Sequence, residues 1–305
     1  MKHKTRSWFR LILFLLLVGG LYLLFRGYEQ SFLFHPSPTL TKTPQDLDLA
    51  FDSVILTTAD DVNIHGWYVP QNGGEDQVTT AEVVPCLLYL DGSNGNCSDR
   101  LQKSRVFHDL GFDVFIIDYR GYGRSAGAPT ERGLMADALA AYSYVLDKRG
   151  VKPQRLYLYG EDLGAAVAID LATKVRAAGL IAEGATASVL EEIEQAWPLI
   201  PWQYLLQNKF DSVSKMRNVH IPVLFIHSSD DEVVSFNDSR RLFSLANEPR
   251  QLVQIHGSHA DAFVNSFDVY YDSISQFVRA EPKNNPVATS ASTSNGAELS
   301  NEPSP

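Results

Sequence analysis

Residues 156–166 read LYLYGEDLGAA, a buried-strand pattern that passes through a Gly-x-Asp-x-Gly turn into the start of a helix. Gly160 and Gly164 remove Cβ atoms on both sides of a strained turn, so the side chain of Asp162 is expected to project at the carboxyl edge of a sheet. After a strand and before a helix, such a turn indicates a nucleophile elbow. A plain tight turn, which needs only one glycine, is the alternative.

Short apolar runs alternate with helix-length amphipathic stretches on both sides of this turn, a pattern typical of an α/β fold with a mostly parallel sheet flanked by helices. Eight strands are expected: Ser53–Thr57, Ile64–Val69, Cys86–Leu90, Val114–Asp118, Leu156–Tyr159, Leu180–Glu183, Val223–His227 and Leu252–Ile255. The first two lie close together and predict a hairpin, so the sheet should be mixed. A helix should begin after Thr130 and end at Gly150.

The net charge of −10 would repel phosphate backbones, and Lys and Arg cluster only at the extreme N-terminus, so we expect no nucleic-acid partner. Cys86 and Cys97 stand in no Cys/His spacing, so neither a zinc site nor a disulfide framework is predicted. We likewise expect no cofactor. The length of 305 residues favours one globular unit with short appendages.

The N-terminus carries an apolar run from Leu11 to Phe25, extended past Arg10 by Trp8 and Phe9 to about 18 residues, near the minimum for a membrane span. Basic residues precede it: Lys2, Lys4, Arg6 and Arg10. We expect residues 1–28 to form a single-pass signal-anchor with a cytoplasmic N-terminus, which places the body, residues 29–280, on the periplasmic or lumenal side. A cleaved signal peptide is the alternative, although no A-x-A site follows the run.

Two residues lie where a sheet-edge site needs them. Asp231 and His259 each follow a predicted strand end, and the order nucleophile, acid, histidine is that of the α/β-hydrolase fold. Asp231 would orient His259, and the backbone N–H of Leu163, together with the loop at Ser93, would form an oxyanion hole. The alternative is that Asp231 caps a loop and His259 is solvated.

Three further segments carry a resemblance: FHPSP at 34–38, TAD followed by HGWYVP at 58–70, and DYRGYGRS at 118–125. With them, residues 25–280 resemble the membrane-anchored α/β-hydrolases related to the bud-emergence protein and to the serine aminopeptidase-like hydrolases. The resemblance implies an α/β-hydrolase fold with a small lid insertion at about 186–218. It also implies a serine hydrolase of ester or thioester substrates, with His259 and Asp231 in its triad.

Two departures from that family change the expected chemistry. Asp91 replaces the histidine of the oxyanion loop, and Asp162 replaces the nucleophilic serine. A carboxylate attacks an ester poorly and would form an anhydride that reverts, so serine-type hydrolysis is not expected. Aspartate at this position resembles haloalkane dehalogenases and epoxide hydrolases, in which it attacks an sp3 carbon and histidine activates water. Those enzymes need a leaving-group cradle, and Leu163 stands where a tryptophan commonly follows.

Aromatic residues of the predicted lid, Trp197, Trp202 and Tyr204, are expected to contact a small apolar or lipid-like substrate. The alternative is that they pack the lid against the body. Beyond residue 280 the chain is rich in Pro, Ser, Asn and Thr, so residues 281–305 are expected to be disordered.

Carboxylates could crowd the site: Asp91, Glu161, Asp162 and Asp231. Such crowding raises carboxyl pKa values and keeps a histidine protonated. A divalent cation is conceivable there, but acidic loops are usually solvated, and we expect no metal.

Three interpretations of function remain open. The chain is a divergent hydrolase that uses Asp162 as nucleophile or water-positioning group, an inactive relative that binds a ligand or a protein, or a serine hydrolase with a displaced serine at Ser93 or Ser125. We favour the hydrolase with the Asp162, Asp231 and His259 constellation.

Overall fold

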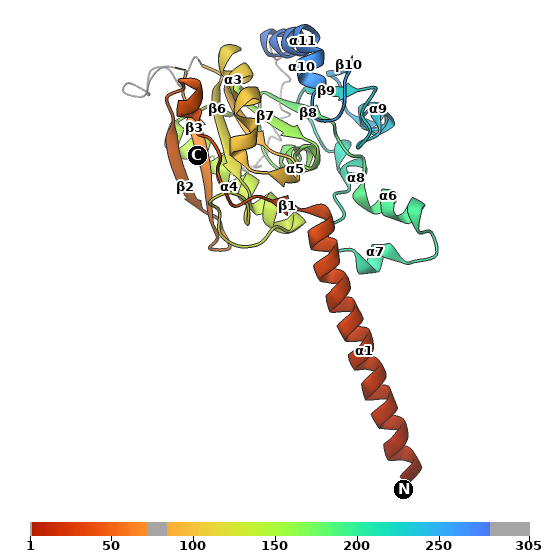
Figure 1. Ribbon diagram of the computed structural model, residues 1–305. Helices are drawn as coiled ribbons and strands as arrows, with labels where there is room; N and C mark the ends of the chain where they lie inside the picture. Colours follow the sequence, from red (N-terminus) through yellow and green to blue (C-terminus); the bar gives the residue numbers. More distant parts are fainter. Residues whose placement is uncertain (1, 72–83, 281–305) are drawn as a thin grey trace, which may run out of the picture.

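The computed structural model describes residues 2–71 and 84–280, and the side chains of all of these except residues 2–7, 10 and 11. The tail predicted to be disordered, residues 281–305, lies outside the described residues. A long helix, α1 (Lys2–Leu33), leaves a body in which helices flank a central sheet (Figure 1).

The central sheet has eight strands in the order β10-β9-β8-β7-β4-β6-β3-β2. Their bounds are β2 Asp52–Thr57, β3 Asn63–Val69, β4 Cys86–Leu90, β6 Asp113–Asp118, β7 Leu156–Glu161, β8 Gly179–Glu183, β9 Val223–Ser228 and β10 Arg250–Ile255. The pairs β2–β3 and β3–β6 are antiparallel and the others parallel. The predicted strands, the hairpin and the mixed sheet are thus confirmed, with strand ends within two residues of expectation.

Helices cover both faces of the sheet because successive side chains of its strands point to opposite faces. Leu88 packs in the core that α4 and α5 cover, whereas Leu87 and Tyr89 pack in the core that α3 and α11 cover. The helix bounds are α3 Leu101–Asp109, α4 Glu131–Arg149, α5 Leu163–Ala172, α6 Val189–Ala196, α7 Trp202–Leu205, α8 Ser212–Met216, α9 Phe236–Leu245, α10 Ala262–Asn265 and α11 Phe267–Arg279; short 3-10 turns are Pro44–Leu47, Cys97–Arg100 and Pro153–Arg155.

Helix α4 shows how local sequence sets these bounds. The hydroxyl oxygen of Thr130 accepts a hydrogen bond from the N–H of Gly133, and Gly150 ends the helix in the left-handed conformation, with φ 70°. Both caps satisfy backbone groups that a helix end leaves unpaired. The predicted helix between Thr130 and Gly150 is therefore confirmed.

Charged side chains form ion pairs between segments that lie far apart in the sequence. His65 Nδ1 lies 2.9 Å from Asp118 Oδ2, and both side chains are buried. Arg120, two residues further on, pairs with Asp60 at 2.7 Å and with the fully buried Asp137 at 2.8 Å. Two of the segments that carry the family resemblance are thus joined by ion pairs, the buried His65–Asp118 pair and the Arg120 cluster with Asp60 and Asp137.

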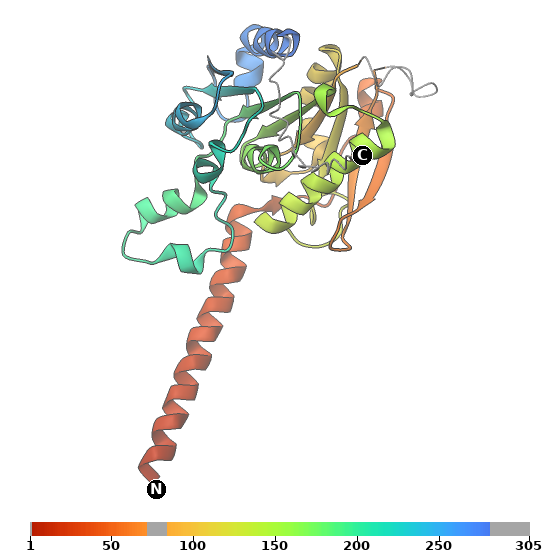
Figure 2. The same cartoon turned by 180° about the vertical axis from the view of Figure 1, so that it is seen from behind.

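The N-terminal helix is joined to the body at its C-terminal end. The buried carboxylate of Glu29 accepts hydrogen bonds from the backbone N–H groups of Gln207 and Asn208, at 3.0 and 2.8 Å. The chain then enters a short strand, β1 (His35–Pro36), which pairs in parallel with β5 (Asn94–Gly95). Figure 2 shows α1 projecting away from the sheet, with α7 beside its upper end.

Candidate active site

Asp162 stands between β7 and α5 in a conformation that costs energy, with φ 51° and ψ −123°. Gly160 and Gly164 must be glycines because neighbouring backbone atoms lie too close to each of them to leave room for a Cβ. A Cβ at Gly160 would lie 2.3 Å from the carbonyl oxygen of Gly164, and a Cβ at Gly164 would lie 2.2 Å from that of Leu90. The turn therefore fits tightly between two strands and a helix, and it holds Asp162 at the carboxyl edge of the sheet.

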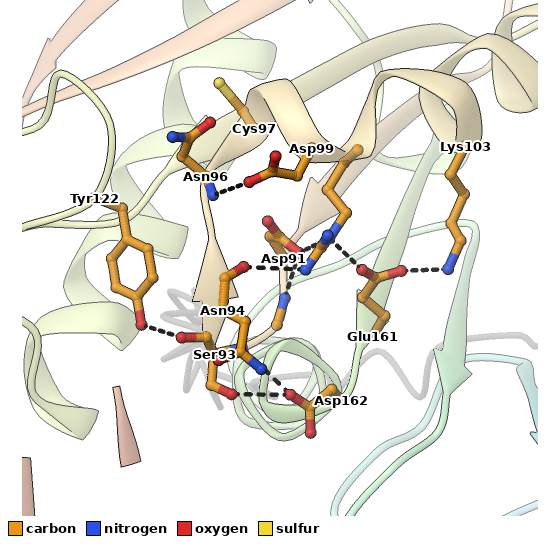
Figure 3. A network of polar contacts seen from close by, with 12 residues as sticks. Asp91, Ser93, Asn94, Asn96, Cys97, Asp99, Lys103, Tyr122, Glu161 and Asp162 are labelled. Atoms are coloured by element: carbon orange, nitrogen blue, oxygen red, sulfur yellow. Dashed lines mark hydrogen bonds and ion pairs between the residues drawn. The ribbon is translucent and has the colours of Figure 1, made fainter. Parts of the chain in front are cut away.

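The loop after β4 supplies hydrogen-bond donors to this carboxylate. The backbone N–H of Ser93 lies 3.3 Å from Asp162 Oδ2, and the Ser93 hydroxyl lies 3.1 Å from the same oxygen (Figure 3). Leu163 is the first residue of α5, so its N–H has no acceptor within the helix, and its side chain is buried. The structure thus brings Ser93, Asp162 and Leu163 together.

Neighbouring segments hold the Ser93 loop in place. The Tyr122 hydroxyl donates to the carbonyl oxygen of Ser93 at 2.8 Å, and the backbone N–H of His35 donates to the same oxygen at 2.9 Å. The amide of Asn96 reaches back to the carbonyl of Thr39 at 2.8 Å. The loop is therefore fixed by the chain that follows α1 as well as by the sheet.

Asp231 and His259 form the second half of the site. His259 Nδ1 lies 2.9 Å from Asp231 Oδ2, while Asp231 Oδ1 accepts the backbone N–H groups of Val233 and Val234, each at 2.8 Å. The hydrogen bond to Asp231 raises the pKa of His259, and the charges of Asp162 and Glu161 act in the same direction. This pair leaves the other ring nitrogen, Nε2, for proton transfer.

The crowding of carboxylates predicted from the sequence has a mixed outcome. Burial opposes ionisation of Asp231, but hydrogen bonds from His227, His259 and the backbone hold its pKa below the usual range. Burial raises the pKa of Asp91 well above its ordinary value. The general expectation of raised carboxyl pKa values is therefore wrong for Asp231, because its hydrogen-bond donors outweigh its burial.

Two cations offset the negative charge beside Asp162. Arg100 Nε lies 2.5 Å from Asp91 and 2.6 Å from Glu161, and Lys103 pairs with Glu161 (Figure 3). Lys103 also pairs with Glu183, at 2.9 Å. Burial opposes ionisation of Glu161, but these cations outweigh it and lower its pKa. Sequence reasoning missed Arg100, Lys103 and Glu183. Arg100 and Lys103 lie three residues apart, about one helical turn, in the helical segment after the Ser93 loop, and this spacing was the signal that could have identified them.

A cavity of about 400 Å³ lies at this edge of the sheet. Its lining includes Asp162, Asp231 and His259, together with Arg100 and Lys103. Trp197, Trp202 and Tyr204, which were expected to contact substrate, are not among the lining residues. They lie on the segment between β8 and β9 that extends toward α1, where the ring of Trp202 packs on that of Phe25 with centroids 5.6 Å apart.

Ser125, considered as a displaced nucleophile, has a structural role. Its hydroxyl donates to the carbonyl oxygen of Asp118 at 2.6 Å and accepts a hydrogen bond from the backbone N–H of His65 at 2.8 Å.

Close to Ser125 lies a cluster of possible metal ligands that spacing along the chain did not reveal. The ligand atoms of His65, Cys97 and Asp118 lie within 4.8 Å of one another. Asp118 accepts hydrogen bonds from the backbone N–H and the thiol of Cys97, so we interpret the cluster as a buried structural link.

Comparison with known proteins identifies a matching family model and relatives of this chain. A family model described as "Serine aminopeptidase, S33" matches residues 85–214. An uncharacterized protein of Mycobacterium tuberculosis is 31% identical over 264 residues, which cover 86% of this chain and 92% of that protein. The protein bem46 of Schizosaccharomyces pombe is 29% identical over 258 residues, covering 81% and 82% respectively.

Among solved structures, an esterase of Pyrococcus furiosus superposes with a TM-score of 0.67 at 18% identity, covering 82% of this chain and 98% of the esterase. At that identity the likeness shows the fold alone, and it confirms the α/β-hydrolase architecture expected from the sequence. The chain therefore belongs to the bem46-like family of α/β-hydrolase-fold proteins, which is related to the serine aminopeptidases.

Proposed function

We propose that this protein is a membrane-tethered hydrolase in which Asp162 attacks an electrophilic sp3 carbon, His259 activates water and Asp231 orients His259. One observation carries the proposal: Asp162 Oδ2 accepts hydrogen bonds from the N–H and hydroxyl of Ser93. We assign the attack to the other oxygen, Oδ1. The oxygen that becomes the ester carbonyl then already lies in the oxyanion hole before any chemistry occurs.

The reaction has two steps. First, an electron pair of Oδ1 forms a bond to carbon, and the leaving group departs with the electrons of the bond that breaks, which gives an alkyl ester on Asp162. Second, Nε2 of His259 takes a proton from water, and the hydroxide adds to Cγ of the ester. Ser93 and Leu163 donate hydrogen bonds to the negative charge that develops on Oδ2. Collapse releases the alkoxide, which takes the proton from His259 and leaves as the alcohol. Asp162 is then a carboxylic acid, and loss of its remaining proton to the solvent restores the carboxylate.

The size of the cavity limits the substrate to a small molecule or to the reactive end of a longer one. Alkyl halides and epoxides are the substrate classes whose chemistry matches an aspartate nucleophile. An ester does not match, because attack by a carboxylate would yield an anhydride that reverts.

Membrane tethering belongs to the same proposal. The segment Ile12–Leu33 of α1 is long and apolar enough to cross a membrane, with a mean hydropathy of 1.6. Basic residues cluster before this segment, so we place the N-terminus in the cytoplasm and the body on the other side.

The test is intact and peptide mass spectrometry of the full-length protein after incubation with mixed alkyl halides and epoxides in heavy-oxygen water. In the parent, water attacks Cγ, so heavy oxygen should enter the carboxylate of Asp162. In His259→Ala the alkyl ester should accumulate on Asp162. The matched control is His256→Ala, since His256 also pairs with an aspartate, at 3.2 Å, but is exposed and is not among the cavity residues. A label on substrate alone, with none on Asp162, would refute the proposal.

A non-catalytic binding protein is the second candidate, and one observation favours it. Asp162 and Asp91 stand where the family has its nucleophilic serine and its oxyanion-loop histidine, and Arg100 joins Asp91 to Glu161 beside the cavity. If neither an adduct nor heavy oxygen is found with any electrophile, this candidate replaces the first.

A further inference from the structure

Exposed apolar side chains gather on one short segment between α6 and the end of α7. Residues 197–204, the apolar tip, include Leu199 with 97% of its surface exposed and Tyr204 with 79%. Trp197 and Ile200 are exposed as well, at 63% and 38%. Clusters of exposed large apolar residues on a protein surface mark sites where something else binds.

The apolar tip lies beside α1. The ring of Trp202 packs on Phe25, and the Trp202 indole N–H donates to the carbonyl oxygen of Trp197 at 2.9 Å, which fastens the two ends of the tip together. Both views of the molecule show α7 next to the end of α1 that enters the body (Figures 1 and 2).

The position of the tip along α1 is fixed by polar contacts. Glu29, one turn after Phe25, accepts hydrogen bonds from the backbone N–H groups of Gln207 and Asn208, which lie three and four residues after the end of the tip. The side-chain amide of Asn208 donates to the same carboxylate oxygen at 3.0 Å. The tip therefore cannot slide along the helix without breaking buried hydrogen bonds.

This position coincides with the expected edge of the hydrocarbon layer. The uninterrupted apolar run of α1 ends at Phe25, and Arg26 follows. Residues 195–208 read QAWPLIPWQYLLQN and contain no charged side chain. Trp and Tyr concentrate at membrane–water interfaces, where an aromatic ring meets the lipid and a polar edge meets water.

We propose that the apolar tip inserts into the interfacial region of the outer leaflet, beside α1, and binds lipid. This inference rests on the proposed insertion of α1. The body is then held against the bilayer at two points, the anchor and the tip, which limits its rotation about the anchor. A lipid surface is the occupant that the position favours, because α1 places bilayer lipid at the level of the tip.

The experiment places one fluorophore at a time on the full-length protein. Cys86 and Cys97 are fully buried, so a thiol-reactive dye should label only an introduced cysteine. Leu199→Cys and Tyr204→Cys report on the tip, and Val269→Cys on the exposed surface of α11, far from α1, is the matched control. Each labelled protein is reconstituted in phosphatidylcholine–phosphatidylglycerol vesicles and quenched with doxyl-labelled lipid or with iodide in the water.

We expect doxyl lipid to quench the dye at positions 199 and 204, and iodide to quench it at position 269. A fourth variant, Leu16→Cys in α1, tests the anchor independently. If doxyl lipid quenches the dye at 16 while iodide quenches it at 199 and 204, the inference on the tip is overturned and the anchor stands. If iodide reaches position 16, the anchor fails and the inference fails with it. Protection of 199 and 204 from both quenchers indicates a protein partner or a second copy and also overturns the inference.

Discussion

Substitution of Gly164 by alanine should separate the two halves of the oxyanion hole. The added Cβ would lie 2.2 Å from the carbonyl oxygens of Leu90 and Asp91, where ordinary contacts begin near 3.4 Å. Backbone atoms cannot rotate away, so α5 and the loop that follows β4 must move apart by about 1 Å, judged from those distances. The contact from the Ser93 N–H to Asp162 is already 3.3 Å long, and such a movement breaks it.

The expected magnitudes follow from that displacement. Overpacking of this kind destabilises a fold by about 1–3 kcal/mol. A misplacement of about 1 Å lowers the rate of a positioned reaction by about 100-fold. Because the loss falls on the second step, Gly164→Ala should accumulate the alkyl ester on Asp162.

Urea unfolding and mass spectrometry of the full-length variant check both effects. The matched control is Gly27→Ala, since nothing lies within 4 Å of a Cβ at Gly27 and alanine is favoured in a helix. A Gly164→Ala protein with the stability and turnover of its parent would refute the argument that the tight turn sets the oxyanion hole.

Three further predictions concern the residues of the candidate site and the Arg120 cluster. Asp162→Ser should give the protein measurable turnover of p-nitrophenyl esters; background rates in a folded variant would mean that the oxyanion hole does not function. The hydrogen bond to Asp231 raises the pKa of His259, and only the neutral imidazole can act as a base. Hydrolysis of the alkyl ester on Asp162 should therefore speed up as the pH rises through a value above 6.5. Asp231→Asn should move that increase to lower pH, as a pH profile of kcat will show. Arg120→Met should lower stability by about 3–5 kcal/mol, because it leaves the buried carboxylate of Asp137 with a backbone hydrogen bond but no cation. Since burial raises the pKa of Asp137, this loss of stability should shrink as the pH falls, and a double variant with Asp137→Leu should recover it in urea unfolding.

The fold could be predicted because its central strands, β4, β6, β7 and β9, are buried on both faces and therefore appear as continuous apolar runs. The ends of the strands were predicted less accurately, because they depend on how each strand pairs with its neighbour. Strand β7 extends two residues beyond the predicted Tyr159, since Gly160 and Glu161 pair with Ala182 and Glu183 of β8. No property of Gly160 alone indicates strand, so this extension depends on the neighbouring strand.

The site was predictable to the extent that topology alone positions it. Parallel strands end at one edge, so Asp162, Asp231 and His259 were expected to meet there, and all three line one cavity. The ion pairs around them were not predictable. Arg100 and Lys103 contact Glu161 only because the helical segment after the Ser93 loop turns both side chains toward it, and the sequence does not give that orientation. The contact of Trp202 with Phe25 was not predictable for a similar reason, since nothing in the sequence around Trp202 indicates that it packs on α1.

The parallel pairing of β1 with β5 means that the segment after α1 helps to build the Ser93 loop of the candidate site as well as connecting α1 to the body. His35 pairs with Asn94, and the buried Phe34 before it contacts Phe210 edge-on at 6.1 Å. If α1 anchors the protein as proposed, a protease that releases the body from the membrane would leave an intact site only by cutting before Phe34. A cut a few residues later would remove the strand that holds Ser93 in place, and shedding would then also abolish the proposed activity.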